Sequence, residues 1–345
     1  MAGSLFKITV PALGTLIMLS CAMWQPARTV SPLEGKVICL DPGHGGTAAF
    51  DSYRVGPTGE REEWIDLRVA LILKDMLEAK GARVLMTRTE DVQVPLKDRA
   101  VLAVENKADV FISIHHNATA DSEVNFPIIY YHGNASENLA SVQLGKCLAR
   151  RVNKALFDGK KPVSLVSDHT IFPTAGSAVL RHSYGIPAVI CEASFFTNPE
   201  EEQRLKNKEY NRKEAEAYAR ALEDFFSLTR LPIKEKYSHG MLTPFPVFQE
   251  AERMNEIAKR WQQDFIEARQ LMSEETTDSL GKAYQLFSRS AKSFPDSWVA
   301  RECHIYRAKI LQKIGKKEEA AQERRRIEEY YIPIDLKSFG KNQEM

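Results

Sequence analysis

The chain has 345 residues, of which 43% are hydrophobic, and this is enough apolar material for more than one domain. Its 47 basic and 46 acidic residues leave a formal net charge of +1, so no basic field indicates a nucleic-acid partner. The five cysteines are widely spaced and form no Cys-x-x-Cys pair, which argues against a thiolate zinc site or a redox motif.

The first 22 residues have the pattern of a secretory signal peptide. Lys7 is the only charge before the apolar stretch Ile8–Leu19, and small residues follow that stretch. Twelve or so apolar residues are too few to favour a spanning helix, although an uncleaved membrane anchor is the alternative. The four residues that end at Cys21 resemble a bacterial lipobox, so lipidation of Cys21 and ordinary cleavage after Ala22 both stay open. The pattern predicts an exported protein of the periplasm or cell envelope.

From Gly35 to Thr229, strand-like and helix-like segments alternate, which predicts an α/β layer fold with a mostly parallel sheet flanked by helices. Strands are expected in five short runs of apolar and β-branched residues: Lys36–Leu40, Ala82–Thr87, Asp109–Ile114, Phe126–Tyr131 and Pro187–Glu192. Helices are expected where apolar residues recur at helical spacing: Glu63–Ala79, Leu96–Glu105, Ser136–Phe157 and Arg212–Leu228.

A smaller, all-helical region is expected at the C-terminus. Residues 230–245 carry proline, glycine and charge without periodicity, which predicts a linker. Residues 246–335 then show no strand signal, and similar small and aromatic residues recur about 37 positions apart, close to the tetratricopeptide period. A plain helical bundle is the alternative, and in either case we expect these helices to bury a core of their own. The expected helices are Val247–Met272, Thr277–Ser293, Trp298–Gly315 and Lys317–Tyr330.

Three polar motifs follow predicted strands: DPGHGG at Asp41–Gly46, SIHHNA at Ser113–Ala118 and CEASFFTN at Cys191–Asn198. In an open α/β sheet the carboxyl ends of the strands form the ligand crevice. His44, His115 and Glu192 can therefore converge at one edge of one sheet. Two imidazoles and a carboxylate are the layout of a hydrolytic zinc site, in which three protein ligands leave one position open for water.

The residues alone leave the third ligand open. A glycine-rich loop before the first long helix carries Glu60, Glu62 and Glu63, but acidic residues at a helix start are also favoured by the helix dipole alone. Glu192 follows an apolar run, where a carboxylate is costly without a partner. It is either a further ligand or a general base for an activated water.

The remaining histidines carry weaker signals. His116 follows His115 in an extended segment, so the two side chains are expected on opposite faces of the sheet. His169 and His182 precede the last predicted strand and are candidates to line a substrate groove. The others have no supporting context and are assigned to structural or exposed positions: His132, His239 and His304.

Taken together, residues 35–229 resemble the zinc-dependent N-acetylmuramoyl-L-alanine amidases, which are bacterial cell-wall hydrolases. The order and spacing of several motifs carry the resemblance: DPGHGG, Gly59-x-x-Glu62 before Asp66-Leu67, Thr87-Arg88, Leu96 with Arg99, ADVFISIHHNA at Ala108–Ala118, and IPAVICEASFFTNPEE at Ile186–Glu201. The chain departs from the family pattern after GHGG, where TAAFDSYRVGP replaces the usual Asp-x-Gly-Ala stretch.

The resemblance implies a Zn²⁺ ion held by His44, Glu62 and His115, with Glu192 as the catalytic acid/base. The implied reaction is hydrolysis of the amide bond between N-acetylmuramic acid and L-alanine in peptidoglycan, for cell-wall remodelling or cell separation. A zinc peptidase acting on the stem peptide and an inactive wall-binding scaffold are the alternatives. Expected partners are peptidoglycan and a protein that binds the C-terminal helices. No nucleic acid is expected, and a membrane only through the signal or a lipid anchor.

Overall fold

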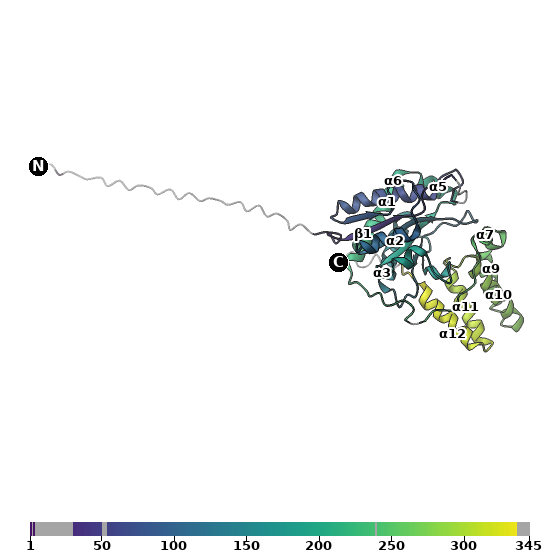
Figure 1. The fold of residues 1–345 in the computed structure, drawn as a ribbon. Coiled ribbons are helices and arrows are strands. Elements are labelled where there is room, and N and C mark those ends of the chain that lie inside the picture. The colour runs from purple at the N-terminus through teal and green to yellow at the C-terminus, as the bar shows by residue number, and fades with distance from the viewer. Residues whose placement is uncertain (2, 4–29, 50–53, 239, 337–345) are drawn as a thin grey trace. The chain divides into compact units, whose positions relative to one another are not determined.

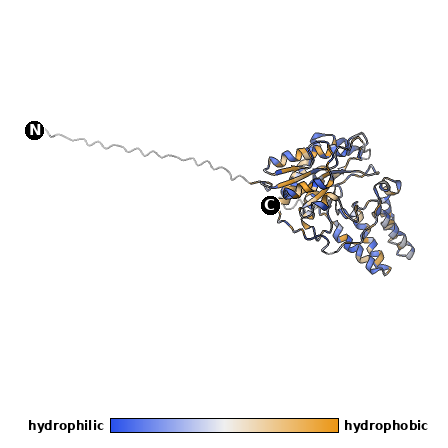
Figure 2. Ribbon diagram, in the orientation of Figure 1, coloured by the Kyte–Doolittle hydropathy of each residue, from blue (hydrophilic) through white to orange (hydrophobic). Residues whose placement is uncertain are grey.

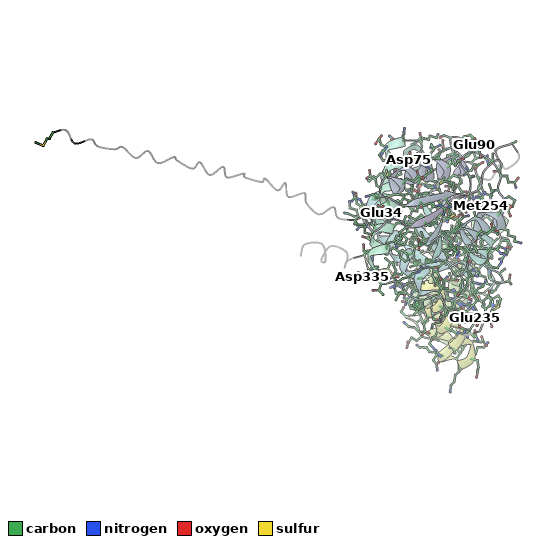
Figure 3. All side chains as sticks on the ribbon, turned by 60° about the vertical axis from the view of Figure 1, so that its left-hand side comes forward. Glu34, Asp75, Glu90, Glu235, Met254 and Asp335 are labelled. Carbon is green, nitrogen blue, oxygen red and sulfur yellow. The ribbon has the colours of Figure 1, made fainter. Side chains whose placement is uncertain are left out.

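The computed structural model describes residues 1, 3, 30–49, 54–238 and 240–336 (Figure 1). The predicted signal peptide, with Cys21 and Ala22, falls almost wholly outside this part of the chain. From Ser31 onward the described residues belong to one unit. None of the helices within the described ranges combines the length and the apolar character needed to cross a bilayer. Charged side chains such as Asp75, Glu90 and Glu235 lie on the periphery (Figure 3).

A seven-stranded sheet, in the order β2-β1-β3-β6-β4-β5-β7, forms the centre of the fold. Strands β2, β1, β3 and β6 are parallel, whereas β4 and β5 run the opposite way and β7 is antiparallel to β5. The predicted mostly parallel α/β sheet is thus confirmed, and all five expected strands form. The bounds are β1 Val37–Pro42, β2 Arg83–Met86, β3 Val110–Asn117, β4 Ile128–Tyr131, β5 Ser164–Ser167, β6 Ala188–Phe195 and β7 Tyr331–Ile332.

Alternate residues of the strands face two apolar layers, because successive side chains of a strand point to opposite sides. Ile38 and Leu40 pack in one layer, which also receives α1, α3 and α6, while Cys39 packs in the other with α2 and α4. The helices carry hydrophobic and hydrophilic residues side by side, as elements with one buried face do (Figure 2). These helices are α1 Glu62–Glu78, α2 Leu96–Glu105, α3 Leu139–Phe157, α4 Ala178–His182, α5 Pro199–Leu205 and α6 Lys208–Ser227.

The C-terminal helices pack in sequence, α9 on α10, α10 on α11 and α11 on α12 (Figure 1). Helices α10 and α12 have the predicted bounds. The single helix expected over Val247–Met272 is wrong, because it is divided into three with Gln249, Asn255 and Arg260 at the helix starts. The bounds are α7 Glu250–Arg253, α8 Glu256–Lys259, α9 Trp261–Leu271, α10 Thr277–Ser293, α11 Ala300–Lys313 and α12 Lys317–Tyr330.

The expectation that the C-terminal helices bury a core of their own is wrong. The ring of Phe294 lies 6.0 Å from that of Phe126 and 5.0 Å from that of Trp261, so one apolar cluster runs from the sheet into the helices. Strand β7, directly after α12, extends the same sheet. The physical reason is that α2 and α4 are too short to cover the second face of a seven-stranded sheet, and the C-terminal helices cover the rest.

Candidate metal centre

The loop after β1 turns sharply and presents His44. His44, Gly45 and Gly46 all have left-handed backbone conformations, with φ of 54°, 113° and 68°. Two of these positions suit glycine because it lacks a Cβ. At Gly43 the constraint is one of space, since a Cβ there would lie 2.3 Å from the imidazole of His115. The glycines of the DPGHGG motif therefore let the backbone of this loop contact the imidazole of His115 on β3.

Two buried arginines hold this loop in place through hydrogen bonds to its backbone carbonyls. Arg99 pairs with Asp41 at 2.9 Å and donates to the carbonyl oxygen of His44 at 2.5 Å. Arg88 donates to backbone carbonyls of the loop and to that of Glu63 at 2.7 Å, which ties the loop to the first turn of α1. Removing one partner of a buried ion pair typically costs about 3–5 kcal/mol, because the other charge is left uncompensated. The position of His44 is therefore set by contacts with α2 and with the residues after β2, as well as by the loop itself.

His44, Glu62 and His115 come together at the carboxyl edge of the sheet. Glu62 Oε1 lies 3.0 Å from His44 Nε2 and 3.0 Å from His115 Nδ1. The two imidazole rings are 4.8 Å apart and nearly perpendicular. Around a tetrahedral zinc with bonds of about 2.0–2.1 Å, ligand atoms are about 3.3 Å apart. Two imidazole nitrogens and one carboxylate oxygen in this arrangement fit the donor set of a zinc ion.

The electrostatics of the three side chains are those of a site that attracts a cation. Burial raises the pKa of Glu62, but the charge and hydrogen bonds of His44 and His115 outweigh it and hold that pKa well below its usual range. Burial lowers the pKa of His115, yet Glu62 and Glu192 prevail and raise it to about 9. The carboxylate therefore stays ionised and draws positive charge, from a proton or a metal ion, to the imidazole nitrogens.

The two neighbouring glutamates are engaged elsewhere. Glu63 forms an ion pair with Arg61 at 2.7 Å, and Glu60 forms one with Arg68 at 2.7 Å. Glu62, the first residue of α1, is the one whose carboxylate reaches both histidines. Of the three carboxylates, Glu62 is thus the one placed beside both imidazoles.

Glu192 lies beside this group. It is in register with His115 across the parallel pair β3 and β6, so the two side chains leave the same face of neighbouring strands. Its Oε2 atom is buried and has no hydrogen-bond partner. Burial is the main cause that raises the pKa of Glu192 to about 8, and the negative charges of Glu62 and Asp66 add to it. A carboxyl group with a raised pKa and a free oxygen is suited to exchanging protons near neutral pH.

His116 points the other way, as the alternation predicts. Its Nδ1 lies 2.8 Å from Asp66 and its Nε2 lies 3.1 Å from Glu214, and all three side chains are fully buried. Burial opposes protonation, but Glu214 and Asp66 raise the pKa of His116 well above its usual value. This buried network joins β3 to α1 and α6 directly behind the candidate metal centre. No local sequence pattern indicates this network, because the partners are about 50 and 100 residues from His116.

The other histidines do not join this centre. His182 is exposed at the end of α4, and His304 is buried against Glu323 in the C-terminal helices. His169 is only 4% exposed, so it lines no open groove. His132 pairs with Asp168 beside His169 at a different place in the sheet. His239 lies outside the described residues.

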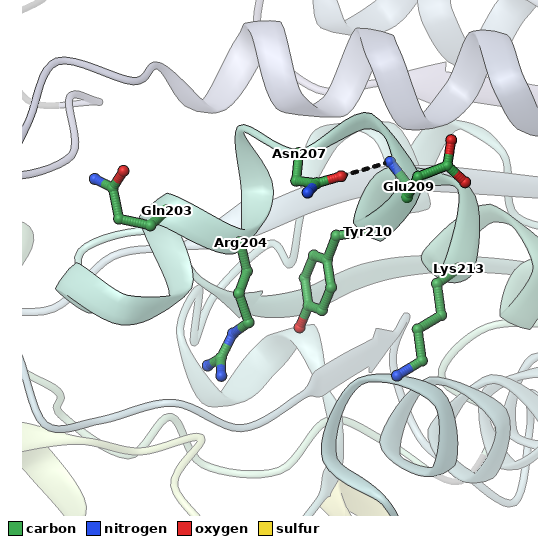
Figure 4. Close-up of a pocket in the computed structure, with 6 residues that line it drawn as sticks. All are labelled: Gln203, Arg204, Asn207, Glu209, Tyr210 and Lys213. Atoms are coloured by element: carbon green, nitrogen blue, oxygen red, sulfur yellow. Dashed lines mark hydrogen bonds between the residues drawn. The ribbon is translucent and has the colours of Figure 1, made fainter.

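A surface pocket on α5 and α6 contains none of the candidate ligands. In Figure 4, Asn207 accepts from the backbone nitrogen of Glu209 at 2.8 Å, which caps α6, and Arg204 and Tyr210 lie near each other. The side chains of Arg204 and Tyr210 both bond to Glu201. The side chains of Asn207, Arg204 and Tyr210 are thus engaged in contacts within the fold, and the pocket offers no group of metal-binding side chains.

A mostly parallel sheet that gathers two histidines and a glutamate at its carboxyl edge, beside an unpartnered glutamate, has the layout of a metal-dependent hydrolase. The chain belongs to the N-acetylmuramoyl-L-alanine amidase family, whose model matches residues 38–224. The match begins in β1 and ends in α6, so it contains all the residues gathered at the candidate centre.

The chain is similar to proteins of the bacterial cell wall. It is 32% identical over 202 residues to the probable cell wall amidase LytH of Staphylococcus epidermidis, covering 57% of this chain and 60% of that protein. It is 30% identical over 226 residues to the N-acetylmuramoyl-L-alanine amidase AmiA of Escherichia coli, covering 55% of this chain and 76% of that protein. The solved amidase AmiC2 of Nostoc punctiforme aligns with a TM-score of 0.48 and 26% identity over 56% of this chain and 99% of that one. The chain thus spans about three fifths of the length of LytH.

Proposed function

We propose that this protein is a zinc-dependent N-acetylmuramoyl-L-alanine amidase. It hydrolyses the amide bond between N-acetylmuramic acid and L-alanine in peptidoglycan, in cell-wall remodelling or cell separation. The family match over residues 38–224 supports the reaction class. The observation that carries the proposal is the approach of His44 and His115 to one oxygen of Glu62, 3.0 Å from each, beside the unpartnered Glu192.

In this proposal His44 Nε2, Glu62 Oε1 and His115 Nδ1 hold the zinc. A zinc ion with three protein ligands supplies Lewis acidity and lowers the pKa of water to about 7. Glu192 accepts the proton of the attacking water and returns it to the leaving amine of L-alanine. Arg99 and Arg88 keep the His44 loop in place, and the network behind β3 holds that strand in register.

The C-terminal helices and the N-terminal segment place the enzyme rather than perform the reaction. The helices resemble tetratricopeptide repeats, and stacked helix pairs of that kind commonly present a binding surface to a protein partner. The first 22 residues direct export to the periplasm or cell envelope, with either lipidation of Cys21 or cleavage after Ala22. Residues 35–229, 230–245 and 246–335 are the proposed catalytic domain, linker and helical region.

The reaction is tested on an N-acetylmuramoyl dipeptide whose first residue is L-alanine. We expect zinc-loaded protein to release a primary amine at L-alanine and a free lactyl carboxylate. Chelation should stop the reaction and added zinc should restore it, while Glu192→Gln stays inactive with zinc present. Full activity after complete removal of the metal would refute the zinc mechanism. Cleavage after L-alanine instead of before it would favour the stem-peptide peptidase.

A further inference from the structure

A second group of metal-binding side chains lies toward the opposite edge of the sheet. Strand β4 runs antiparallel to β6, with Ile128 opposite Glu192 and Tyr130 opposite Ile190. His132 directly follows β4 and is therefore near the beginning of β6, whereas Glu192 is in the second half of that strand. Four residues separate His132 from Ile128, which corresponds to a distance on the order of 13 Å along the strand direction. This group is thus distinct from the candidate metal centre.

The group consists of His132, Asp168 and His169. Its ligand atoms lie within 4.8 Å of one another, and His132 Nδ1 is 2.8 Å from Asp168 Oδ2. The two imidazole rings are 5.5 Å apart. Two imidazoles bound to one tetrahedral zinc at about 2.0 Å have ring centres about 5 Å apart. The spacing of these rings is therefore close to that needed for both to bind one ion.

Both histidines retain a buried nitrogen that no hydrogen bond uses. His132 is 1% exposed and His169 is 4% exposed, and the Nε2 atom of each has no partner. A buried polar atom without a partner costs free energy, so such atoms call for a ligand.

The loop around Asp168 is shaped to orient the carboxylate. The backbone nitrogen of Ser177 donates to Oδ2 at 2.7 Å, and that of Gly133 donates to Oδ1 at 3.3 Å. Gly176 has a φ of 64°, and a Cβ there would lie 2.5 Å from Asp168 Oδ2 and 2.7 Å from His132 Nδ1. A glycine in this position lets the loop close over the group. Backbone bonds that fix a carboxylate in this way commonly orient metal ligands.

We propose that the imidazoles of His132 and His169, with Asp168 orienting the ring of His132, bind a second divalent transition-metal ion, for which zinc is the probe because imidazole nitrogens are among its usual ligands. This ion fastens the last helix to the sheet. The ring of Tyr330, at the end of α12, stacks on that of His169 at 5.8 Å. Next to it, the hydroxyl of Tyr131 donates to the carbonyl oxygen of Glu329 at 2.6 Å. The proposal is independent of the reaction at the candidate metal centre.

The test counts zinc atoms per chain by mass spectrometry, after loading with zinc and exhaustive dialysis against metal-free buffer. We expect two zinc ions in the wild type and one in His44→Ala/His115→Ala. We also expect one in His132→Gln/His169→Gln. His182→Gln removes an exposed histidine and serves as the matched control, which should retain two. A wild type with one ion, kept in His132→Gln/His169→Gln, overturns the proposal.

The His44→Ala/His115→Ala protein decides the question even if the other double variant fails to fold, because its second group is intact. One bound zinc, with a Tm that rises when zinc is added, supports the second site, and no bound zinc overturns it. A single zinc in the wild type that is lost only from His132→Gln/His169→Gln would support the second site. That result would also overturn the ligand assignment at the candidate metal centre. Failure of one proposal can therefore be told apart from failure of the other.

Discussion

Replacing Phe294 by alanine should destabilise the sheet and the C-terminal helices together. Phe294 is 3% exposed, and its ring lies 6.0 Å from Phe126, 6.2 Å from Phe195 and 5.0 Å from Trp261. It therefore joins side chains on both sides of the proposed boundary between catalytic domain and helical region. Removal of a buried phenylalanine side chain typically costs about 3–5 kcal/mol, through lost burial and the cavity that remains. We expect a loss of about 4 kcal/mol in the free energy of unfolding.

The assay is urea unfolding followed by two probes on the same samples. In a Trp64→Phe background, tryptophan fluorescence reports on the helices through Trp261 and Trp298, and release of the zinc held by His44, Glu62 and His115 reports on the candidate metal centre. Both midpoints should fall together, with the slope of the unfolding free energy against urea unchanged. Phe172→Ala is the control, since Phe172 is 50% exposed and surface changes usually stay within about 0.5 kcal/mol.

A shifted fluorescence midpoint with an unshifted zinc-release midpoint would refute the reasoning, because it would show that the sheet folds without the helices. The same argument predicts the fate of a chain truncated near Ile233. Such a chain would expose Phe126, Ile128 and Tyr130, which the full chain buries. We therefore expect it to be less stable than the full chain, and to aggregate or lose zinc rather than fold as an independent enzyme.

Three further outcomes follow from individual contacts. Glu192→Gln should bind zinc normally and lose about 10²–10⁴-fold in rate in the dipeptide assay, since general acid–base groups typically contribute that much; wild-type turnover would make Glu192 structural. Gly43→Ala should weaken zinc affinity by at least about 10–100-fold in a chelator competition, the range seen when the surroundings of a ligand are disturbed, because its Cβ would collide with the ring of His115. Gly281→Ala, where a Cβ meets nothing within 4 Å, is the control, and equal affinities in the two variants would contradict the geometry. Burial raises the pKa of Glu323, but the hydrogen bonds and charges of His304 and Arg307 outweigh burial and lower that pKa to about 2. A carboxyl group with a lowered pKa stabilises the fold at pH values above its ordinary pKa of 4.5. The free energy of unfolding that Glu323→Gln loses should therefore shrink as the pH falls from 4.5 toward 2, as measured by urea titration. A difference in unfolding free energy that does not change with pH would show that the charge has no such role.

Much of the fold follows from local patterns. Short apolar runs predict five strands, and helical spacing gives α2, α10 and α12 with the observed bounds. Strand β5 is not predicted by these patterns, because Ser164–Ser167 has only two apolar residues between its serines. Strand β7 has two residues and forms where the end of α12 meets β5, so no local pattern indicates it.

The part of the candidate site that lies at the ends of strands could be predicted from the sequence. His44 follows β1 and His115 lies near the end of β3, and the carboxyl ends of these two strands meet at one edge, so their convergence follows from the order of elements. The choice of Glu62 over its neighbours depends on how the first turn of α1 faces the sheet, which spacing does not determine. The His132–Asp168–His169 group depends on the reversed direction of β4, and nothing in the residues near His132 indicates that reversal.

The central claim is that the protein cleaves peptidoglycan at the bond between N-acetylmuramic acid and L-alanine. Digestion of purified peptidoglycan with the zinc-loaded full chain, followed by mass analysis of the new termini, tests it directly. We predict intact stem peptides that begin with a free L-alanine amine, together with glycan strands whose lactyl carboxylates are free. Glycan strands that keep L-alanine, or no new termini at all with zinc bound, would contradict the account.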